Sequence, residues 1–264
     1  MPSPFDNLGG VKTLLWLVLF LIGLAGVVLP ALYIHTASKL PQLETEFDLE
    51  TQLRHSIEGE RVSIQAGTTE HKRPIAFKRP DFSRLPKDLV ALYIAQLGCP
   101  TYFQTPREDG PKWAWRLFSV VAFGSEPRGD GVCERLIAVR LAKALGIEGT
   151  LEQAVAANRL HSFLQKDQLL AYDMATLYFD RGIVGVEDAA YKLFGSELDT
   201  LQLPQLAEMA LTLPPHYLYG DAVVCRNASL IRQNRDVLLS DLAGFKLVTE
   251  ERARTAMAQP VICR

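Results

Sequence analysis

The stretch KDQLLAYDMATLYFDRGIVGVEDAAYKLFG, from Lys166 to Gly195, carries the clearest signal for the fold. Its apolar residues recur every three or four positions, which is typical of helices with one buried face. The pattern predicts one helix over Asp167–Phe179 and a second over Gly185–Phe194. Gly195 follows the second run at the place where a glycine commonly ends a helix. This stretch therefore indicates a helical domain.

Similar signals continue in both directions from this stretch. Pro86 opens the apolar periodicity of LPKDLVALYIAQL, and Gly146 ends that of ERLIAVRLAKAL. The remaining predicted helices cover residues 151–164, 204–213, 227–242 and 249–257. Ahead of Leu85, residues 36–50 read as a polar stalk, and the alternation of Arg61–Gly67 predicts a short strand. The predicted fold class is mainly α, with a short extended segment leading into the domain.

A strongly apolar run, LLWLVLFLIGLAGVVLPALYI, extends from Leu14 to Ile34 and has no ionisable side chain. A helix needs about 20 apolar residues to cross a bilayer, and this run has that length. Trp16 and Tyr33 lie near its two ends, where aromatic rings prefer the membrane interface. A cleaved signal peptide would have a shorter apolar core and a small-x-small site, whereas His35 occupies the best candidate site. We predict an uncleaved membrane anchor.

The anchor divides the chain into four predicted parts. They are a cytoplasmic tail (1–13), the transmembrane anchor (14–34), a stalk with an extended segment (35–84) and a helical domain (85–264).

Composition excludes several classes of protein. The 264 residues include 28 Lys and Arg against 30 Asp and Glu, which gives a net charge of −2 and argues against a nucleic-acid partner. Hydrophobic residues make up 48% of the chain, which excludes a mainly disordered protein. The 4 Cys form no CxxC pair and the 5 His are scattered, so we predict no metal site. Nucleotide-binding and nucleophile motifs are also absent, and no cofactor is expected.

An aromatic stretch around Trp113, Trp115 and Phe118 allows two interpretations. Burial in the core is the default for such residues. Beside an anchored domain, the same side chains could instead contact the membrane interface.

The order of segments resembles the family 51 glycosyltransferases. These are peptidoglycan polymerases, found as monofunctional enzymes and as the N-terminal module of bifunctional penicillin-binding proteins. The motifs that carry the resemblance are KDQLL from Lys166, GVEDAA from Gly185, LQLPQLA from Leu201 and LPP from Leu213. The resemblance implies a lysozyme-like helical fold on the periplasmic side of the bacterial inner membrane, and the anchor predicted from the apolar run fits that location independently.

The catalytic positions of that family are not retained. In the family, one glutamate acts as general base on a sugar hydroxyl, and a second assists departure of the lipid diphosphate. Alignment from Leu85 places Leu97 and Gly98 where the first Glu-Asp pair would stand, and Gln153 where the second glutamate would stand. The resemblance therefore implies a pseudoenzyme with no catalytic residue.

An alternative is that the alignment has slipped. Relocated acids could then support catalysis, and the candidates are Glu108, Asp109, Glu134 and Glu152. With such acids the chain would be an active polymerase of lipid II.

The resemblance also suggests a disulfide. Cys99 falls in the first motif region and Cys133 in the second, and in the family these regions face each other across the active site. Outside the cytoplasm such a pair would tend to oxidise and close the vacated site. Cys225 and Cys263 form a second candidate pair, and the alternative is four unpaired buried thiols.

Three functions follow from these observations. The favoured one is an inactive, membrane-anchored glycosyltransferase-like protein that binds lipid II, a glycan strand or a partner in cell-wall synthesis. The others are an active polymerase and a helical scaffold that serves protein contacts alone.

Overall fold

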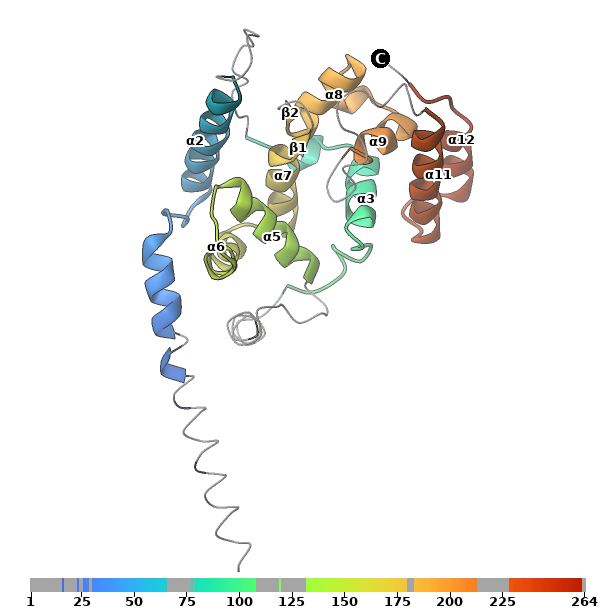
Figure 1. The fold of residues 1–264 in the computed structure, drawn as a ribbon. Coiled ribbons are helices and arrows are strands. Elements are labelled where there is room, and N and C mark those ends of the chain that lie inside the picture. Colours follow the sequence, from blue (N-terminus) through green and yellow to red (C-terminus); the bar gives the residue numbers. More distant parts are fainter. Residues whose placement is uncertain are drawn as a thin grey trace, which may run out of the picture.

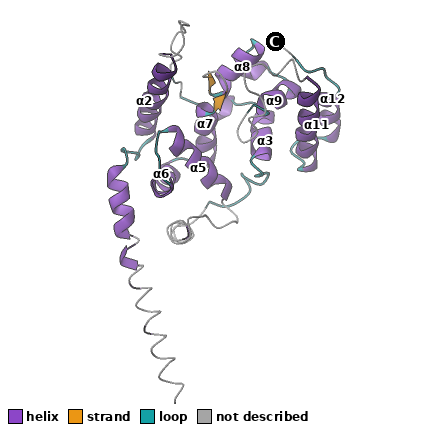
Figure 2. Ribbon diagram, viewed as in Figure 1, coloured by secondary structure: helices purple, strands orange, loops and turns teal. Residues whose placement is uncertain are grey.

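Helices dominate the chain in the computed structural model (Figure 1), as the colouring by secondary structure also shows (Figure 2). The structure describes residues 30–65, 79–107, 132–179, 183–212 and 228–262, together with Trp16, Gly23, residues 26–28, Phe77 and Ser119. The α-helices are α2 (Glu46–Gln65), α3 (Lys87–Gln96), α5 (Val132–Ala144), α6 (Thr150–Phe163), α7 (Lys166–Thr176), α8 (Val186–Phe194), α9 (Leu203–Ala210), α11 (Ala228–Gly244) and α12 (Glu250–Met257). The short 3-10 helices are η1 (Phe82–Arg84) and η3 (Leu198–Thr200). The predicted mainly α fold is confirmed.

The helices pack in two groups. In one, α5 lies against α6 and α7; in the other, α3 contacts α9 and α11, and α11 contacts α12. Helix α8 touches both α7 and α9 and so links the groups. A continuous apolar core runs through both and includes Leu89, Leu141, Leu169 and Leu239. Burial of these side chains removes apolar surface from water, which is the main favourable contribution to folding.

The helix that was predicted to continue to Phe179 ends earlier, at Thr176. Two short antiparallel strands follow, β1 (Tyr178–Phe179) and β2 (Ile183–Val184). Gly185 closes this hairpin with a φ of +84°, and its N–H donates to Leu177 O at 2.8 Å. A Cβ at Gly185 would lie 2.6 Å from the carbonyl oxygen of Ala175, so the close approach requires glycine.

The predicted helix signals at Gly195 and Thr249 are confirmed. Gly195 ends α8 in the left-handed conformation with a φ of +64°, and its N–H donates to Tyr191 O. Thr249 caps the start of α12, and its side chain accepts a hydrogen bond from Arg252 N.

The predictions for the stalk and the strand are wrong where the structure describes them. Residues 30–39 are helical, and α2 continues to Gln65, so residues 61–65 of the expected strand are helical. Leu49, Leu53 and Ile57 are buried at a spacing of four residues, which gives α2 one apolar face against the domain. That face stabilises a helix and outweighs the short alternating pattern further along the chain.

Within the described residues, no helix combines the length and apolar character needed to cross a membrane. Most of the predicted anchor, residues 14–34, lies outside the described residues. The described apolar side chains at Trp16, Val27 and Ile34 are all exposed.

Candidate functional site

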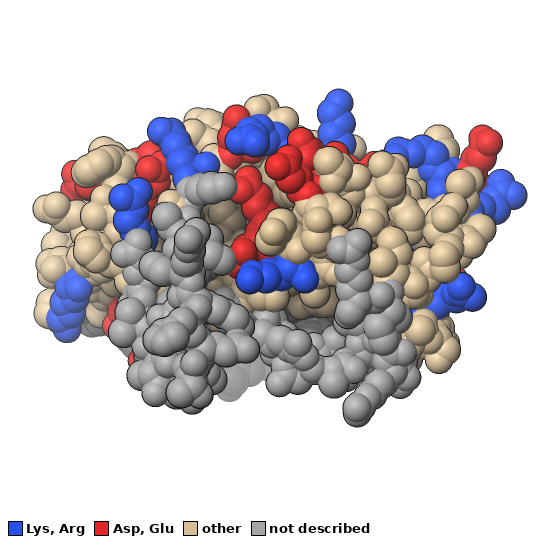
Figure 3. Space-filling model, turned by 90° about the horizontal axis from the view of Figure 1, so that it is seen from above, with Lys and Arg blue, Asp and Glu red and all other residues tan. Residues whose placement is uncertain are grey.

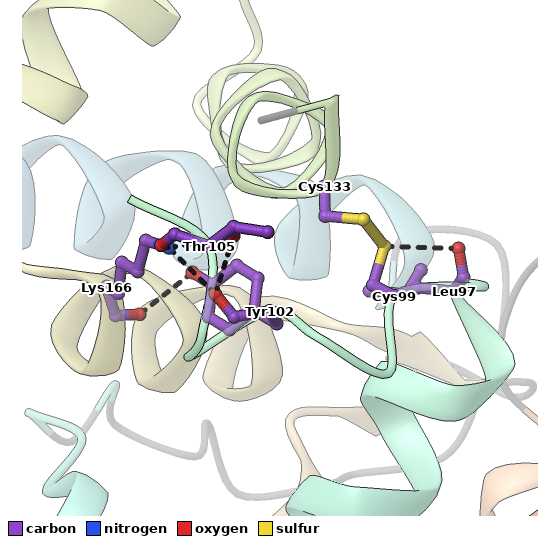
Figure 4. Close-up of a disulfide and its surroundings, with 6 residues drawn as sticks. All are labelled: Leu97, Cys99, Tyr102, Thr105, Cys133 and Lys166. Carbon is purple, nitrogen blue, oxygen red and sulfur yellow. Dashed lines mark hydrogen bonds between the residues drawn. A yellow bond between two sulfur atoms is a disulfide. The ribbon is translucent and has the colours of Figure 1, made fainter. Parts of the chain in front are cut away.

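The first two motif regions meet at the end of α3 and the start of α5. Leu97 follows the last turn of α3, and Gly98 reverses the chain with a φ of +70°. Cys99 and Cys133 then form a disulfide with their Cα atoms 5.9 Å apart (Figure 4). The structure thus contains the cysteine pair that the resemblance suggested. The other candidate pair, Cys225 and Cys263, lies outside the described residues.

Gln153, at the place expected for the second glutamate, binds the local backbone. Its side-chain amide donates to Ile147 O at 3.0 Å, which ties the start of α6 to the preceding loop. The Glu152 side chain lies over the same helix end. A Cβ built on Gly149 would be only 2.2 Å from Glu152 Oε2. Neither contact places an acid beside the disulfide.

Glu134 is the relocated acid that the structure places at this junction. It lies in the first turn of α5, and its side chain is 3% exposed. Arg107 Nε donates to Glu134 Oε1 at 3.0 Å, and Lys166 Nζ lies 3.9 Å from Oε2. His161 Nε2 lies 3.1 Å from Oε1, at an ion-pair distance but without hydrogen-bond geometry. A buried carboxylate is thus surrounded by basic side chains.

Arg107 also binds the carboxyl end of α6. Its NH2 group donates to His161 O at 2.6 Å and to Leu164 O at 2.9 Å. Carbonyls at a helix end lack partners within the helix, so a guanidinium there is favourable. The cation therefore joins the segment after α3 to both α5 and α6.

Lys166 holds the same segment from the side of α7. Its ammonium group donates to Tyr102 O at 2.7 Å, to Thr105 O at 2.5 Å and to Thr105 Oγ1 at 3.2 Å (Figure 4). The Tyr102 hydroxyl donates back to Lys166 O at 3.0 Å. All these donors are directed at the protein itself, so Lys166 has a structural task in this arrangement.

The electrostatics of the cluster fix the charge of Glu134. Burial raises the pKa of a carboxyl, but contacts with His161, Arg107 and Lys166 outweigh it and hold the pKa of Glu134 below its usual value. A general base must reach the hydroxyl of its substrate within hydrogen-bond distance. Glu134 is ionised, but its carboxylate faces the protein's own cations. This geometry suits a structural anion.

A second buried acid lies between α7, α5 and α3. Asp173 lies on α7, and its side chain is 2% exposed. The Tyr93 hydroxyl donates to its carboxylate, and Arg140 Nε lies 3.6 Å away. Burial raises the pKa of Asp173 to about 6, even though Arg140 and Tyr93 both oppose that rise. The three residues connect α7 to α5 and α3.

Local sequence patterns do not reveal the three basic partners of Glu134. His161 is one of five scattered histidines, Lys166 begins the KDQLL motif, and Arg107 belongs to no motif. The spacing of 54 residues between Arg107 and the end of α6 explains why local patterns could not reveal the cluster.

Other predicted site residues lie outside the described part of the chain. They are Glu108, Asp109, Trp113, Trp115 and Phe118. Among the residues that are described, no group of three or more His, Cys, Asp or Glu side chains could hold a metal ion.

The described surface shows mixed charge. In the view from above (Figure 3), Lys and Arg side chains are interspersed with Asp and Glu side chains. This agrees with the net charge of −2.

Comparisons with known proteins agree with the resemblance that the motifs indicate. The Transglycosylase family model matches residues 137–243. Penicillin-binding protein 2a of Streptococcus pneumoniae serotype 2 is 24% identical over 232 residues, which cover 86% of this chain and 30% of the relative. Penicillin-binding protein 1A of Vibrio cholerae serotype O1 is 24% identical over 260 residues, which cover 96% of this chain and 30% of the relative. The resemblance stated from the motifs is confirmed.

The matched segment is a small part of these relatives. The chain spans about 30% of the length of the penicillin-binding proteins from Streptococcus pneumoniae and Vibrio cholerae.

Proposed function

We propose that this chain, a transglycosylase-like relative of penicillin-binding proteins, is a membrane-anchored protein of peptidoglycan synthesis without glycosyltransferase turnover. It has a lysozyme-like helical domain over residues 85–264. Its role is to bind a lipid-linked precursor such as lipid II, or a glycan strand, beside proteins of cell-wall synthesis.

The state of Glu134 carries this proposal. Leu97 and Gln153 occupy the expected acid positions, and neither side chain can take a proton from a sugar hydroxyl. Glu134, the candidate acid beside Cys133 at the disulfide, has a side chain that is 3% exposed and is paired with Arg107. A scaffold that keeps its helices while the acid at the disulfide, Glu134, serves as an internal counter-ion fits a binding protein better than a catalyst.

A location outside the cytoplasm has separate support. Disulfides persist in oxidising compartments, and Cys99 is bonded to Cys133. Trp16, Val27 and Ile34 expose apolar side chains within the run that we predict to span the bilayer. A single-pass anchor over residues 14–34 would leave residues 1–13 in the cytoplasm and the domain on the periplasmic side of the inner membrane.

Polymerisation of lipid II by the purified full-length protein tests the loss of turnover. We expect no glycan product under conditions in which an authentic family 51 polymerase makes one. Turnover that is abolished by Glu108→Gln or Glu152→Gln would show that the chain is an active polymerase with relocated acids. Each variant should be compared with Glu187→Gln, an exposed acid on α8 far from the disulfide in sequence.

A binding measurement separates the remaining functions. We expect labelled lipid II in micelles to bind the wild-type protein without being consumed. Lack of binding to both lipid II and isolated glycan strands would favour a helical scaffold that only makes protein contacts.

A further inference from the structure

The helical segment 30–39 is packed against the domain with no free stalk between them. Arg159 on α6 donates from NH2 to Ala37 O at 2.9 Å and from NH1 to Pro41 O at 3.3 Å. Asn158 Nδ2 donates to the Tyr33 hydroxyl at 3.2 Å. Thr36 and Ala37 are buried in this contact region. Two neighbouring residues of α6 therefore fix the direction in which the N-terminal segment leaves the domain.

The contact lies close to the end of the apolar run. That run ends at Ile34, and Ala37 follows only three residues later. A helix rises 1.5 Å per residue, so Ala37 lies about 5 Å beyond the end of the run along the helix. The polar head-group layer on each side of a bilayer is roughly 5–8 Å thick. If the run spans the hydrocarbon, the part of α6 that holds Ala37 lies at the level of the head groups.

The direction of α6 suits contact along that layer. Figure 1 looks nearly along the axis of α6, whereas the segment 30–39 runs in the plane of the picture. The two helices therefore cross, so an anchor that continues the direction of segment 30–39 through a bilayer would leave α6 parallel to the membrane surface. Helix α8 lies at the opposite end of the domain in the same view.

Local charge also suits a phospholipid surface. From Ala31 to Leu43 the chain has no Asp or Glu, and the exposed side chains there include His35 and Lys39. The carboxyl half of α6, residues 157–163, also lacks acids and contains Arg159. The chain as a whole has a net charge of −2, so these two acid-free stretches are more basic than the chain average. Basic side chains next to a span are attracted to anionic head groups.

We propose that α6 rests on the phospholipid head-group layer and that Arg159 is the positioning residue that holds it there. This inference rests on the proposed membrane anchor. It assigns one face of the domain to the lipid surface and directs α8 away from it. The partner is the head-group layer of a bilayer that contains anionic phospholipid.

The test uses the full chain in vesicles of phosphatidylethanolamine and phosphatidylglycerol with a quencher on the head group. One protein carries an encoded fluorescent amino acid in place of Ser162, an exposed residue one turn after Arg159 on α6. A second carries it in place of Tyr191, which is 65% exposed on α8. We expect the probe at position 162 to lose most of its fluorescence and the probe at position 191 to keep it.

A matched pair of variants tests the role of Arg159. Arg159→Ala should weaken the quenching at position 162 while the protein still floats with vesicles. Arg254→Ala, a change at an arginine that is 75% exposed on α12, should leave the quenching unchanged. Thermal unfolding of each variant checks that it is folded, and the comparison of positions 162 and 191 does not depend on either variant.

Two results would overturn the inference in distinguishable ways. Flotation with equal quenching at both positions, or with none at position 162, would show an anchored domain that does not rest on α6. Failure of the wild-type protein to float with vesicles would remove the anchor itself and the inference with it.

Discussion

Arg107 Nε donates a 3.0 Å hydrogen bond to Glu134 Oε1 across 27 residues of sequence. The same guanidinium binds the carbonyl end of α6, so the pair fastens the segment after α3 to two helices at once. Removing one partner of a buried pair costs more than the pair contributes, because the remaining charge stays buried without compensation. The pair is therefore better suited to holding the fold than to handling a proton of a substrate.

Glu134→Gln should destabilise the fold. The variant leaves Arg107 and Lys166 without their counter-ion, although both keep hydrogen bonds to backbone carbonyls. Since Arg107 is 31% exposed, we expect a loss of about 2–3 kcal/mol in the free energy of unfolding at pH 7, below the full cost of a broken buried pair. Urea unfolding measures it. Glu152→Gln is the control, with a loss of about 0.5 kcal/mol or less, and equal stability of the two variants would contradict the structural role.

The disulfide should stabilise the fold by a similar amount, because the cross-link restricts the unfolded chain. Cys99 and Cys133 are separated by 34 residues, and a cross-link over a loop of this size stabilises a protein by about 3–4 kcal/mol in the chain-entropy description. The double variant Cys99→Ser, Cys133→Ser should lose that amount in urea unfolding. Dithiothreitol should lower the stability of the wild-type protein to that of the variant and leave the variant unchanged. Insensitivity of the wild-type protein to the reductant would argue that the bond is absent in solution.

Gly185 offers a test of the hairpin that separates α7 from α8. Gly185→Ala places a Cβ 2.6 Å from Ala175 O at a φ of +84°, so we expect a loss of about 2 kcal/mol or more in the free energy of unfolding. Gly244→Ala at the end of α11 is the matched control, since nothing lies within 4 Å of its Cβ position. A helical Gly→Ala change is neutral or stabilising by up to about 1 kcal/mol. Chemical denaturation measures the free energy of unfolding of both variants. Similar values would contradict the steric argument.

The helices of the domain could be predicted from the sequence because their signals are local. The run that became α8 shows apolar periodicity and ends at Gly195, and both features lie within ten residues. Helix α2 was missed because its stabilising face, with Leu49 and Leu53, is set by packing against the domain. Tertiary contact there overrides the weak alternation at Arg61–Gly67.

The candidate site was less predictable than the fold. Cys99 and Cys133 could be paired in advance only because the resemblance placed their regions across one site. The partners of Glu134 come from three separate segments, and a single sequence has no pattern that joins Arg107, His161 and Lys166. Such clusters depend on the packing of α5, α6 and α7, which local periodicity does not specify.

Asp173 should give the fold a pH dependence opposite to that of most acids. Its pKa is raised from 3.8 to about 6 by burial, so the folded state binds the proton more tightly than the unfolded state. Between about pH 4 and pH 6 this makes the free energy of unfolding fall as pH rises, by on the order of 2–3 kcal/mol in total. Asp173→Asn removes the titrating group. As pH rises through that window, the free energy of unfolding should therefore fall in the wild type more than in the variant.

Tyr93→Phe provides the matched variant for this effect. The Tyr93 hydroxyl donates to the Asp173 carboxylate and lowers its pKa, so removal of the hydroxyl should raise the pKa of Asp173 further. The window in which stability falls should then extend to higher pH in Tyr93→Phe, with its lower end unchanged, and disappear in Asp173→Asn. Urea unfolding at half-unit steps from pH 4 to pH 8 would resolve both changes. Parallel curves for wild type and both variants would mean that Asp173 keeps an ordinary pKa, and the buried contact with Arg140 would then have to be strong enough to cancel the effect of burial.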